Sequence, residues 1–236
     1  MSAVFRREFK AFFTSPIGYF VLAVMFGFSG YFFTLYNLIG GSASLTGVFA
    51  NVFSIVLLLV LPILTMRLFS DEKRQRTDQA LLTAPVSLTS IVLGKFFAAL
   101  LIFALGSCII LVYAVILSFQ VSPDWVVIFG NYVGMLLLGA MIIAVGLFIS
   151  SLTESQFIAA LGTFAVSFCL TMLDSLSSLF YSNAAVSTVV GFLSITQRYN
   201  DFTSGIISYD NIIFFLSIQV LFLFLTVRVL DRKRWS

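Results

Sequence analysis

The sequence predicts an all-α integral membrane protein with six transmembrane helices. Of its 236 residues, 60% are hydrophobic and only 10% are charged, whereas a soluble domain carries about a quarter charged residues. Apolar runs long enough to cross a bilayer core about 30 Å thick recur along the chain. Basic residues lie near the ends of these runs, so the net charge of +3 reflects membrane topology and does not indicate nucleic-acid binding.

An amphipathic elbow helix is expected at the N-terminus, over residues 3–15. Four aromatic side chains fall on one helical face: Phe5, Phe9, Phe12 and Phe13. The cations Arg6, Arg7 and Lys10 lie off that face. This pattern is typical of a helix in the membrane interface with its cations near anionic headgroups. A plain juxtamembrane anchor is the alternative, and no cleavable signal is indicated because the apolar run that follows is too long.

The six spans are expected over residues 17–39, 48–66, 91–119, 126–150, 156–180 and 211–229. Each is predicted to be helical because the backbone finds no water inside the bilayer. Pro62 removes a backbone donor and predicts a kink or local loosening in the second span. Small residues predict close helix packing in the first and fourth spans: Gly27, Gly30, Gly130, Gly134 and Gly139.

The distribution of basic residues predicts the orientation. An even number of spans returns both termini to one side, and a cytoplasmic N-terminus leaves Arg198 as the only one of 13 basic residues outside. By the positive-inside rule, both termini are therefore cytoplasmic. The apolar stretch 184–196 is too short to cross and is expected as an interfacial or re-entrant helix between spans five and six.

Several chemistries find no support in the sequence. Gly94-Lys95 is followed by Phe96 and lacks the upstream glycine of a phosphate-binding loop. The chain has no histidine, the usual base for a serine nucleophile, so Ser29 in Gly27-Phe-Ser-Gly is interpreted as a packing residue. Asp174 is the one candidate for an intramembrane polar site of a carrier, but it lies near the outer end of span five, which favours a helix-end carboxylate.

The loop 67–90 is the main candidate for contact with a soluble partner. The chain has 13 basic and 10 acidic residues, and eight of these charged residues lie within residues 67–95. Good helix-start residues at Ser70 and Asp71 predict a helix over 71–82, with an apolar patch at its far end. Such a helix suits docking into a protein groove, and a solvated connector along the headgroups is an equal alternative. The turn 151–156 is interpreted first as a helix cap and second as a partner contact.

The residues from Ser70-Asp-Glu-Lys-Arg-Gln-Arg-Thr-Asp-Gln-Ala-Leu-Leu-Thr-Ala-Pro to Ile91-Val-Leu-Gly-Lys resemble the signature of ABC-2 type transporter permeases. More narrowly, they resemble the gliding-motility type subgroup. Phe9-Lys-Ala-Phe-Phe-Thr-Ser-Pro-Ile-Gly-Tyr, Phe202-Thr-Ser-Gly-Ile-Ile-Ser-Tyr-Asp and Leu230-Asp-Arg-Lys-Arg-Trp support this resemblance, which therefore extends over the whole chain.

The resemblance implies a half-transporter, most simply an exporter, in the inner membrane of a prokaryote. Two permease subunits, either two copies or this chain with a related one, would form the pathway among membrane lipids, with room for an accessory membrane protein. Separate cytoplasmic ATPase subunits would hold ATP and magnesium, and this chain would hold no catalytic residue, cofactor or metal. The alternatives are a structural membrane anchor of a surface machine and an ATP-independent carrier or channel.

The resemblance also assigns residues to the partner contact. The loop after span two would form a coupling helix that docks on the ATPase through Asp71, Glu72, Arg74, Thr77, Asp78, Gln79, Leu81 and Leu82. Glu154 would add a second cytoplasmic contact. The family's usual Gly-Thr-x-Glu is replaced here by Arg76-Thr-Asp-Gln, so an acidic contact would come from Asp78 or Glu72.

Overall fold

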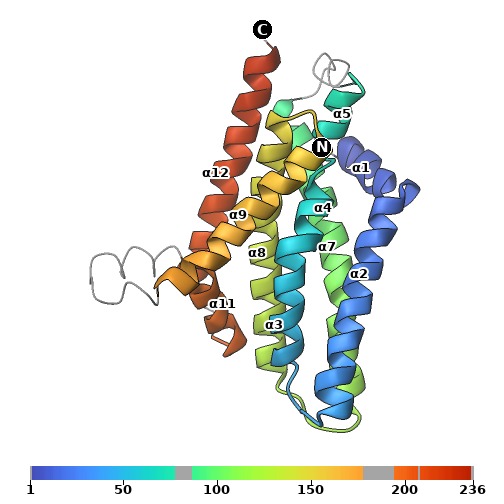
Figure 1. The fold of residues 1–236 in the computed structure, drawn as a ribbon, viewed down its shortest axis with the longest axis vertical. Helices are drawn as coiled ribbons and strands as arrows, with labels where there is room; N and C mark the ends of the chain where they lie inside the picture. Colours follow the sequence, from blue (N-terminus) through green and yellow to red (C-terminus); the bar gives the residue numbers. More distant parts are fainter. Residues whose placement is uncertain (1, 78–86, 178–193, 207, 235–236) are drawn as a thin grey trace.

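The computed structural model describes residues 2–77, 87–177, 194–206 and 208–234, and the regular elements in these ranges are helices. They form one elongated bundle, with α9 inclined across the others (Figure 1). The α-helices are α1 (Ser2–Thr14), α2 (Pro16–Phe33), α3 (Thr46–Ile55), α4 (Leu61–Thr65), α5 (Ser70–Arg74), α7 (Leu88–Ser118), α8 (Trp125–Leu152), α9 (Gln156–Ser177), α11 (Ile195–Thr203) and α12 (Tyr209–Arg234). Two π-helices, η1 (Thr34–Ile39) and η2 (Val56–Val60), follow α2 and α3 without a break.

Five helical stretches in the described residues are long and apolar enough to cross a membrane. They are Pro16–Ile39, Thr46–Arg74, Leu88–Ser118, Trp125–Leu152 and Tyr209–Arg234, and they correspond to five of the six expected spans. The remaining expected span, 156–180, begins with α9, whose apolar part Gln156–Met172 is shorter, and it ends among residues outside the described ranges. The sixth crossing therefore stays a prediction.

Two shorter helices flank the spans. α1 occupies the segment expected for the elbow helix, while its place in a membrane interface stays a prediction. The expected helix over 184–196 falls mostly outside the described residues. The helix seen next to it, α11, is amphipathic and was not anticipated; its Phe202 is fully buried.

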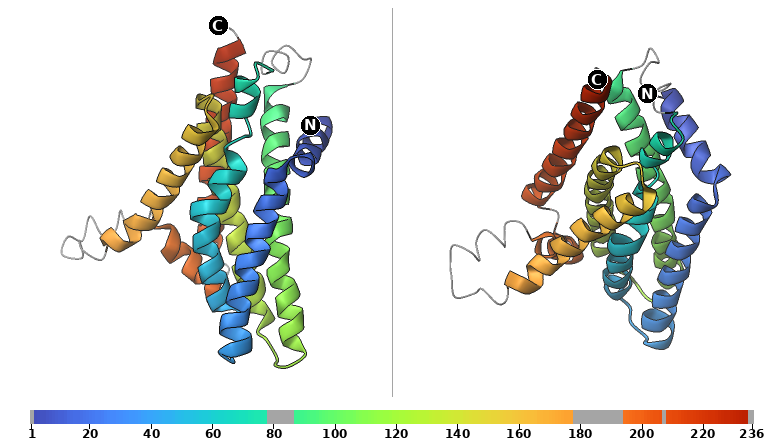
Figure 2. Two further views of the ribbon diagram at one scale, coloured as in Figure 1. Left: turned by 45° about the vertical axis from the view of Figure 1, so that its right-hand side comes forward. Right: turned by 45° about the horizontal axis from the view of Figure 1, so that its top comes forward.

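α8 is the central helix of the bundle. It lies between α12 and α9 on one side and α7 and α3 on the other (Figures 1 and 2). Its glycines permit this crowding, because a Cβ added at Gly130 would lie 2.8 Å from the Phe202 carbonyl oxygen and one at Gly134 would lie 2.8 Å from Phe202 Cβ. The packing role predicted for Gly130, Gly134 and Gly139 is thus confirmed.

The second span is loosened as Pro62 predicted. η2 ends at Val60, two residues before Pro62, and the Leu61 amide donates to the Val56 carbonyl, five residues back. Proline lacks the amide donor that a regular helix needs at this point, and a π-bulge is one of the known ways to accommodate the defect.

The packing prediction for Gly27 is wrong within this chain. An added Cβ at Gly27 meets no described atom within 4 Å, whereas one at Gly30 would lie 3.1 Å from the Tyr113 hydroxyl. The α2 face that carries Gly27 therefore points away from the other described helices.

The glycine contacts predict unequal effects of the same substitution. Gly146→Ala would place a methyl 2.7 Å from Thr65 Cβ, so we expect overpacking between α4 and α8 and a loss of about 1–3 kcal/mol of stability. Gly27→Ala is the matched control and should be neutral or stabilising by up to about 1 kcal/mol, because alanine favours the helix. Thermal unfolding in detergent measures both, and equal melting temperatures would contradict the packing described.

Candidate functional site

The described start of the charged loop, residues 67–77 with α5, lies at the end of the bundle that also holds α1, the start of α7 and the end of α12 (Figure 1). We call this the α5 end. The first turn of α5 is held by a side chain of α8: the Ser150 hydroxyl accepts hydrogen bonds from the amides of Phe69 (3.0 Å) and Ser70 (3.1 Å). The same hydroxyl donates to the Met66 carbonyl, at 3.2 Å. Two amides at the start of a helix, which have no partner within the helix, are therefore satisfied from α8.

Further side chains connect α5 to α8 and α9. The buried Lys73 ammonium donates to the Ser151 carbonyl in the last turn of α8, where a cation is favoured by the helix dipole. The Asp71 carboxylate accepts a hydrogen bond from Gln156, the first residue of α9, at 2.9 Å. The turn between α8 and α9 is thus fixed against the loop.

Four charged residues, Arg7, Glu8, Glu72 and Lys95, form an ion cluster that joins α1, α5 and α7. The Lys95 side chain is 1% exposed, and its ammonium lies 3.1 Å from Glu8 Oε1 and 3.0 Å from Glu72 Oε1. It also donates to the Leu68 carbonyl at 2.6 Å. The Arg7 guanidinium lies 2.6 Å from Glu8 Oε1 and 2.7 Å from Glu72 Oε1, so each carboxylate contacts both cations.

The ion cluster keeps the Glu8 carboxylate charged. Burial alone would raise the pKa of Glu8, but the Lys95 and Arg7 charges and their hydrogen bonds outweigh it and hold that pKa below its ordinary 4.5. Burial opposes the charge of Arg7 as well, and the two carboxylates more than compensate, so the pKa of Arg7 is raised. The stability that ionised Glu8 contributes is therefore present at neutral pH and is lost only as the pH falls through its lowered value.

The helix expected over 71–82 is shorter than predicted, because α5 ends at Arg74. The Arg76 amide donates to the Lys73 carbonyl (3.0 Å) and the Thr77 amide donates to the Glu72 carbonyl (2.9 Å). With Arg76 at φ 56°, these two bonds form a Schellman motif, which ends a helix through one left-handed residue. Glycine adopts this conformation most readily, and Arg76 stands where the permease motif has its glycine.

The residues expected to dock on a partner are distributed unevenly. Arg74 and Thr77 are exposed, while Asp71 and Glu72 are partly buried by the contacts above. Asp78, Gln79, Leu81 and Leu82 lie outside the described residues. Glu154 is exposed and, with Arg74, lines a hollow of about 740 Å³ floored by side chains of α4 and α9. The loop and the 151–156 turn, which the sequence presented separately, thus meet at one surface.

The remaining candidates lie apart from this surface. On α1, Phe5 and Phe9 are stacked with ring centroids 6.0 Å apart, and Arg6 is exposed. Phe12 instead faces the bundle at 1% exposure, with the Arg67 guanidinium 5.2 Å from its ring centroid. Asp174 lies in the last turn of α9, and its side chain is outside the described part.

The sequence interpretation did not anticipate the ion cluster. Its signals were a lysine within an apolar run, which needs a partner, and Glu8, the only acidic residue before Asp71. The roles of Lys73 and Ser150 had no such signal, because a basic residue and a serine near a span end are common.

The described residues thus define a helical, multi-pass membrane protein whose charged loop is fixed to α1, α7, α8 and α9. The sequence model of the family described as "ABC-2 family transporter protein" matches residues 3–235. The chain therefore belongs to the ABC-2 transporter family, whose permeases are membrane components of transporters and generally work with ATPase subunits and dimerise. No curated protein matches the chain.

Replacing the buried lysine is expected to destabilise the protein strongly. Lys95→Met leaves Glu8 and Glu72 without their buried cation, and breaking a buried ion pair costs about 3–5 kcal/mol. Lys10→Met, the same change at an exposed position of α1, should cost less than about 0.5 kcal/mol. Denaturant titration in mixed micelles measures both. Lys95→Met combined with Glu72→Gln should cost less than the sum of the single changes, and strict additivity would argue against the pair.

The Schellman motif predicts that Arg76→Gly stabilises the loop. A left-handed residue with a side chain costs about 1–2 kcal/mol relative to glycine, so the glycine variant should gain about 1 kcal/mol and Arg76→Val should lose stability. Gln75→Gly is the control because Gln75 is right-handed and gains nothing from glycine. Limited proteolysis of the loop reports local stability, and faster cleavage of Arg76→Gly than of the parent would be the opposite of what we expect.

Proposed function

We propose that the chain is the membrane-spanning permease subunit of an ATP-driven exporter of the gliding-motility type, powered by separate cytoplasmic ATPase subunits that hold ATP and magnesium. The family supports the permease assignment. The attachment of α5 to four helices carries the coupling part of the proposal. A force on the exposed side of α5 reaches α1 and α7 through the ion cluster, and α8 and α9 through Ser150 and Gln156.

In this proposal α9 and the residues after it make the sixth crossing, and the α5 end faces the cytoplasm of a prokaryotic cell. Twelve of the 13 basic residues occur in segments at that end, which supports the orientation under the positive-inside rule. α1 then lies in the inner interface as the elbow helix. A second permease, either another copy or a related chain, completes the pathway, because permeases of this family generally dimerise.

The docking surface is the hollow between α5 and the start of α9, together with the residues after Thr77. Arg74 and Glu154 offer opposite charges at its rim, over an apolar floor that includes Ile63 and Met66. A partner side chain that enters it would be recognised by shape at the floor and by charge at the rim. This proposal also assigns docking roles to further residues of the loop: Asp71, Thr77, Asp78, Gln79, Leu81 and Leu82. Glu72 would both contact the ATPase and take part in the ion cluster.

The carrier alternative receives less support. A proton- or ion-coupled carrier needs ionisable groups near the bilayer midplane. Among the side chains described, the buried acidic and basic ones are Glu8, Lys73 and Lys95, and all three are engaged at the α5 end. Asp174 is the residue on which that alternative depends.

Charge reversal at the hollow tests the docking proposal. We expect Arg74→Glu with Glu154→Arg to weaken association with the partner ATPase about five- to ten-fold, because rim charges steer and orient partners. Co-purification and permease-stimulated ATP hydrolysis are the measurements. Arg234→Glu, at the exposed end of α12, is the control. Failure of the parent chain to bind any ATPase would contradict the permease proposal, and unchanged binding of the double variant would contradict only the docking surface.

A further inference from the structure

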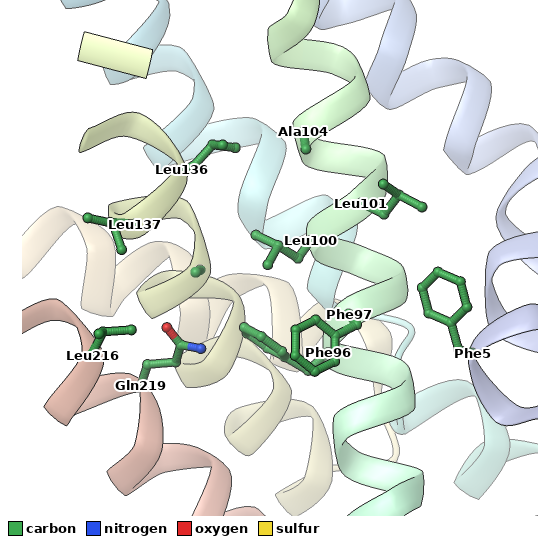
Figure 3. A pocket seen from close by; sticks show the side chains of 11 residues that line it. Phe5, Phe96, Phe97, Leu100, Leu101, Ala104, Leu136, Leu137, Leu216 and Gln219 are labelled. Carbon is green, nitrogen blue, oxygen red and sulfur yellow. The ribbon is translucent and has the colours of Figure 1, made fainter. Parts of the chain in front are cut away.

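A groove of about 880 Å³ follows α7 in its first half (Figure 3). α7 forms its floor, α8 and α12 form one wall, and Phe5 of α1 stands on the other side. Its lining is almost entirely aliphatic and aromatic, with Phe97, Leu101 and Ala104 from α7, Leu137 from α8 and Leu216 from α12. The single polar side chain in the lining is Gln219.

The position of the groove determines what can enter it. α7, α8 and α12 are three of the helices long and apolar enough to cross a membrane, so the groove opens toward hydrocarbon and not toward water. One amide among apolar side chains offers too few hydrogen-bonding groups to select a polar ligand. The occupant is therefore a hydrocarbon chain.

The charges of α1 determine what the hydrocarbon chain is attached to. The buried face of α1 carries Val4, Glu8 and Phe12. In order around the helix axis, the stacked pair Phe5 and Phe9 follows this face. Arg6 and Lys10 lie next to that pair on its far side, one turn apart, and both are exposed. The one acid of α1, Glu8, is turned to the opposite side and bound by Lys95 and Arg7. The exposed side of α1 next to the Phe5–Phe9 pair thus carries two cations and no carboxylate of α1.

We propose that this groove binds an anionic membrane phospholipid, with one acyl chain along α7 and its phosphate group at Arg6 and Lys10. Cationic sites at the membrane surface next to a transmembrane crevice are a known means of selecting anionic lipids. The proposal goes beyond the transport role and does not depend on it, because it requires only that the chain is a multi-pass membrane protein.

Retention of lipid by the purified full chain tests the proposal. The chain is reconstituted into vesicles of equal parts phosphatidylglycerol and phosphatidylcholine, extracted in mild detergent and analysed by native mass spectrometry. We expect phosphatidylglycerol to be retained in preference, and Ala104→Phe, which fills the groove, to reduce the retained lipid several-fold. Ala165→Phe is the matched control, because Ala165 is exposed on α9 outside the groove. Equal retention of the two lipids by the parent, or unchanged retention by Ala104→Phe, would overturn the proposal.

The cations are tested separately with Arg6→Gln and Lys10→Gln together. Since each cation near the surface contributes about a five-fold preference for an anionic lipid, the double variant should retain phosphatidylglycerol and phosphatidylcholine almost equally. If the double variant preferred phosphatidylglycerol as strongly as the parent does, Arg6 and Lys10 would not bind the phosphate group, and the proposed anionic site would be overturned.

A second measurement does not depend on filling the groove. Leu101→Trp, in a chain with Trp125→Phe and Trp235→Phe, places a single fluorophore on the groove floor. We expect stronger quenching by brominated phosphatidylglycerol than by brominated phosphatidylcholine. Equal quenching would overturn the anionic site. Disulfide-linked dimers of Leu101→Cys, in a chain whose own cysteines are replaced by Cys108→Ser and Cys169→Ser, would show that a second copy of the chain occupies the groove instead.

Discussion

The arrangement of the α5 end depends on one buried charge. Lys95 lies in an apolar helix at 1% exposure, and an ammonium taken out of water is stable only with anions and acceptors close to it. Glu8 from α1, Glu72 from α5 and the Leu68 carbonyl supply them. Because these groups come from three separate segments, the need to neutralise Lys95 fixes α1 and α5 against α7. Arg7 then balances the second carboxylate, so the cluster has no net charge.

α8 supplies the second, independent attachment. Its glycines allow α11 and α4 to approach closely, which makes it the central helix of the bundle, and its last turns present the Ser150 hydroxyl and the Ser151 carbonyl to α5. The loop is therefore held from one side by charge and from the other by neutral and charge-assisted hydrogen bonds. Loss of either set would still leave α5 attached to the bundle, but on one side only.

Much of the fold could be predicted because membrane spans have a strong local signal. Apolar length predicted the five helices that are long and apolar enough to cross a membrane, and the missing amide of Pro62 predicted the loosened turn at η2. The ion cluster was beyond reach because its Glu8–Lys95 contact joins residues 87 positions apart, and pairing over such distances is not encoded in local patterns. The early end of α5 was missed because Arg76 adopts a glycine-like conformation, which its residue type does not indicate. The packing prediction for Gly27 was wrong because a small residue in a helix does not show whether another helix lies against it.

These attachments differ in stiffness, and the difference suggests how movement passes through the fold. Separating α5 from α1 and α7 would expose charges at a cost of about 3–5 kcal/mol, so these three elements are expected to move as one body. Toward α3, the same loop continues through α4 into η2, where the π-helical turn before Pro62 has already departed from regular helix bonding. π-helical turns inside α-helices are frequent at functional sites. A displacement of α5 would therefore reach α1 and α7 undiminished, while η2 lets α3, on its far side from α5, respond separately.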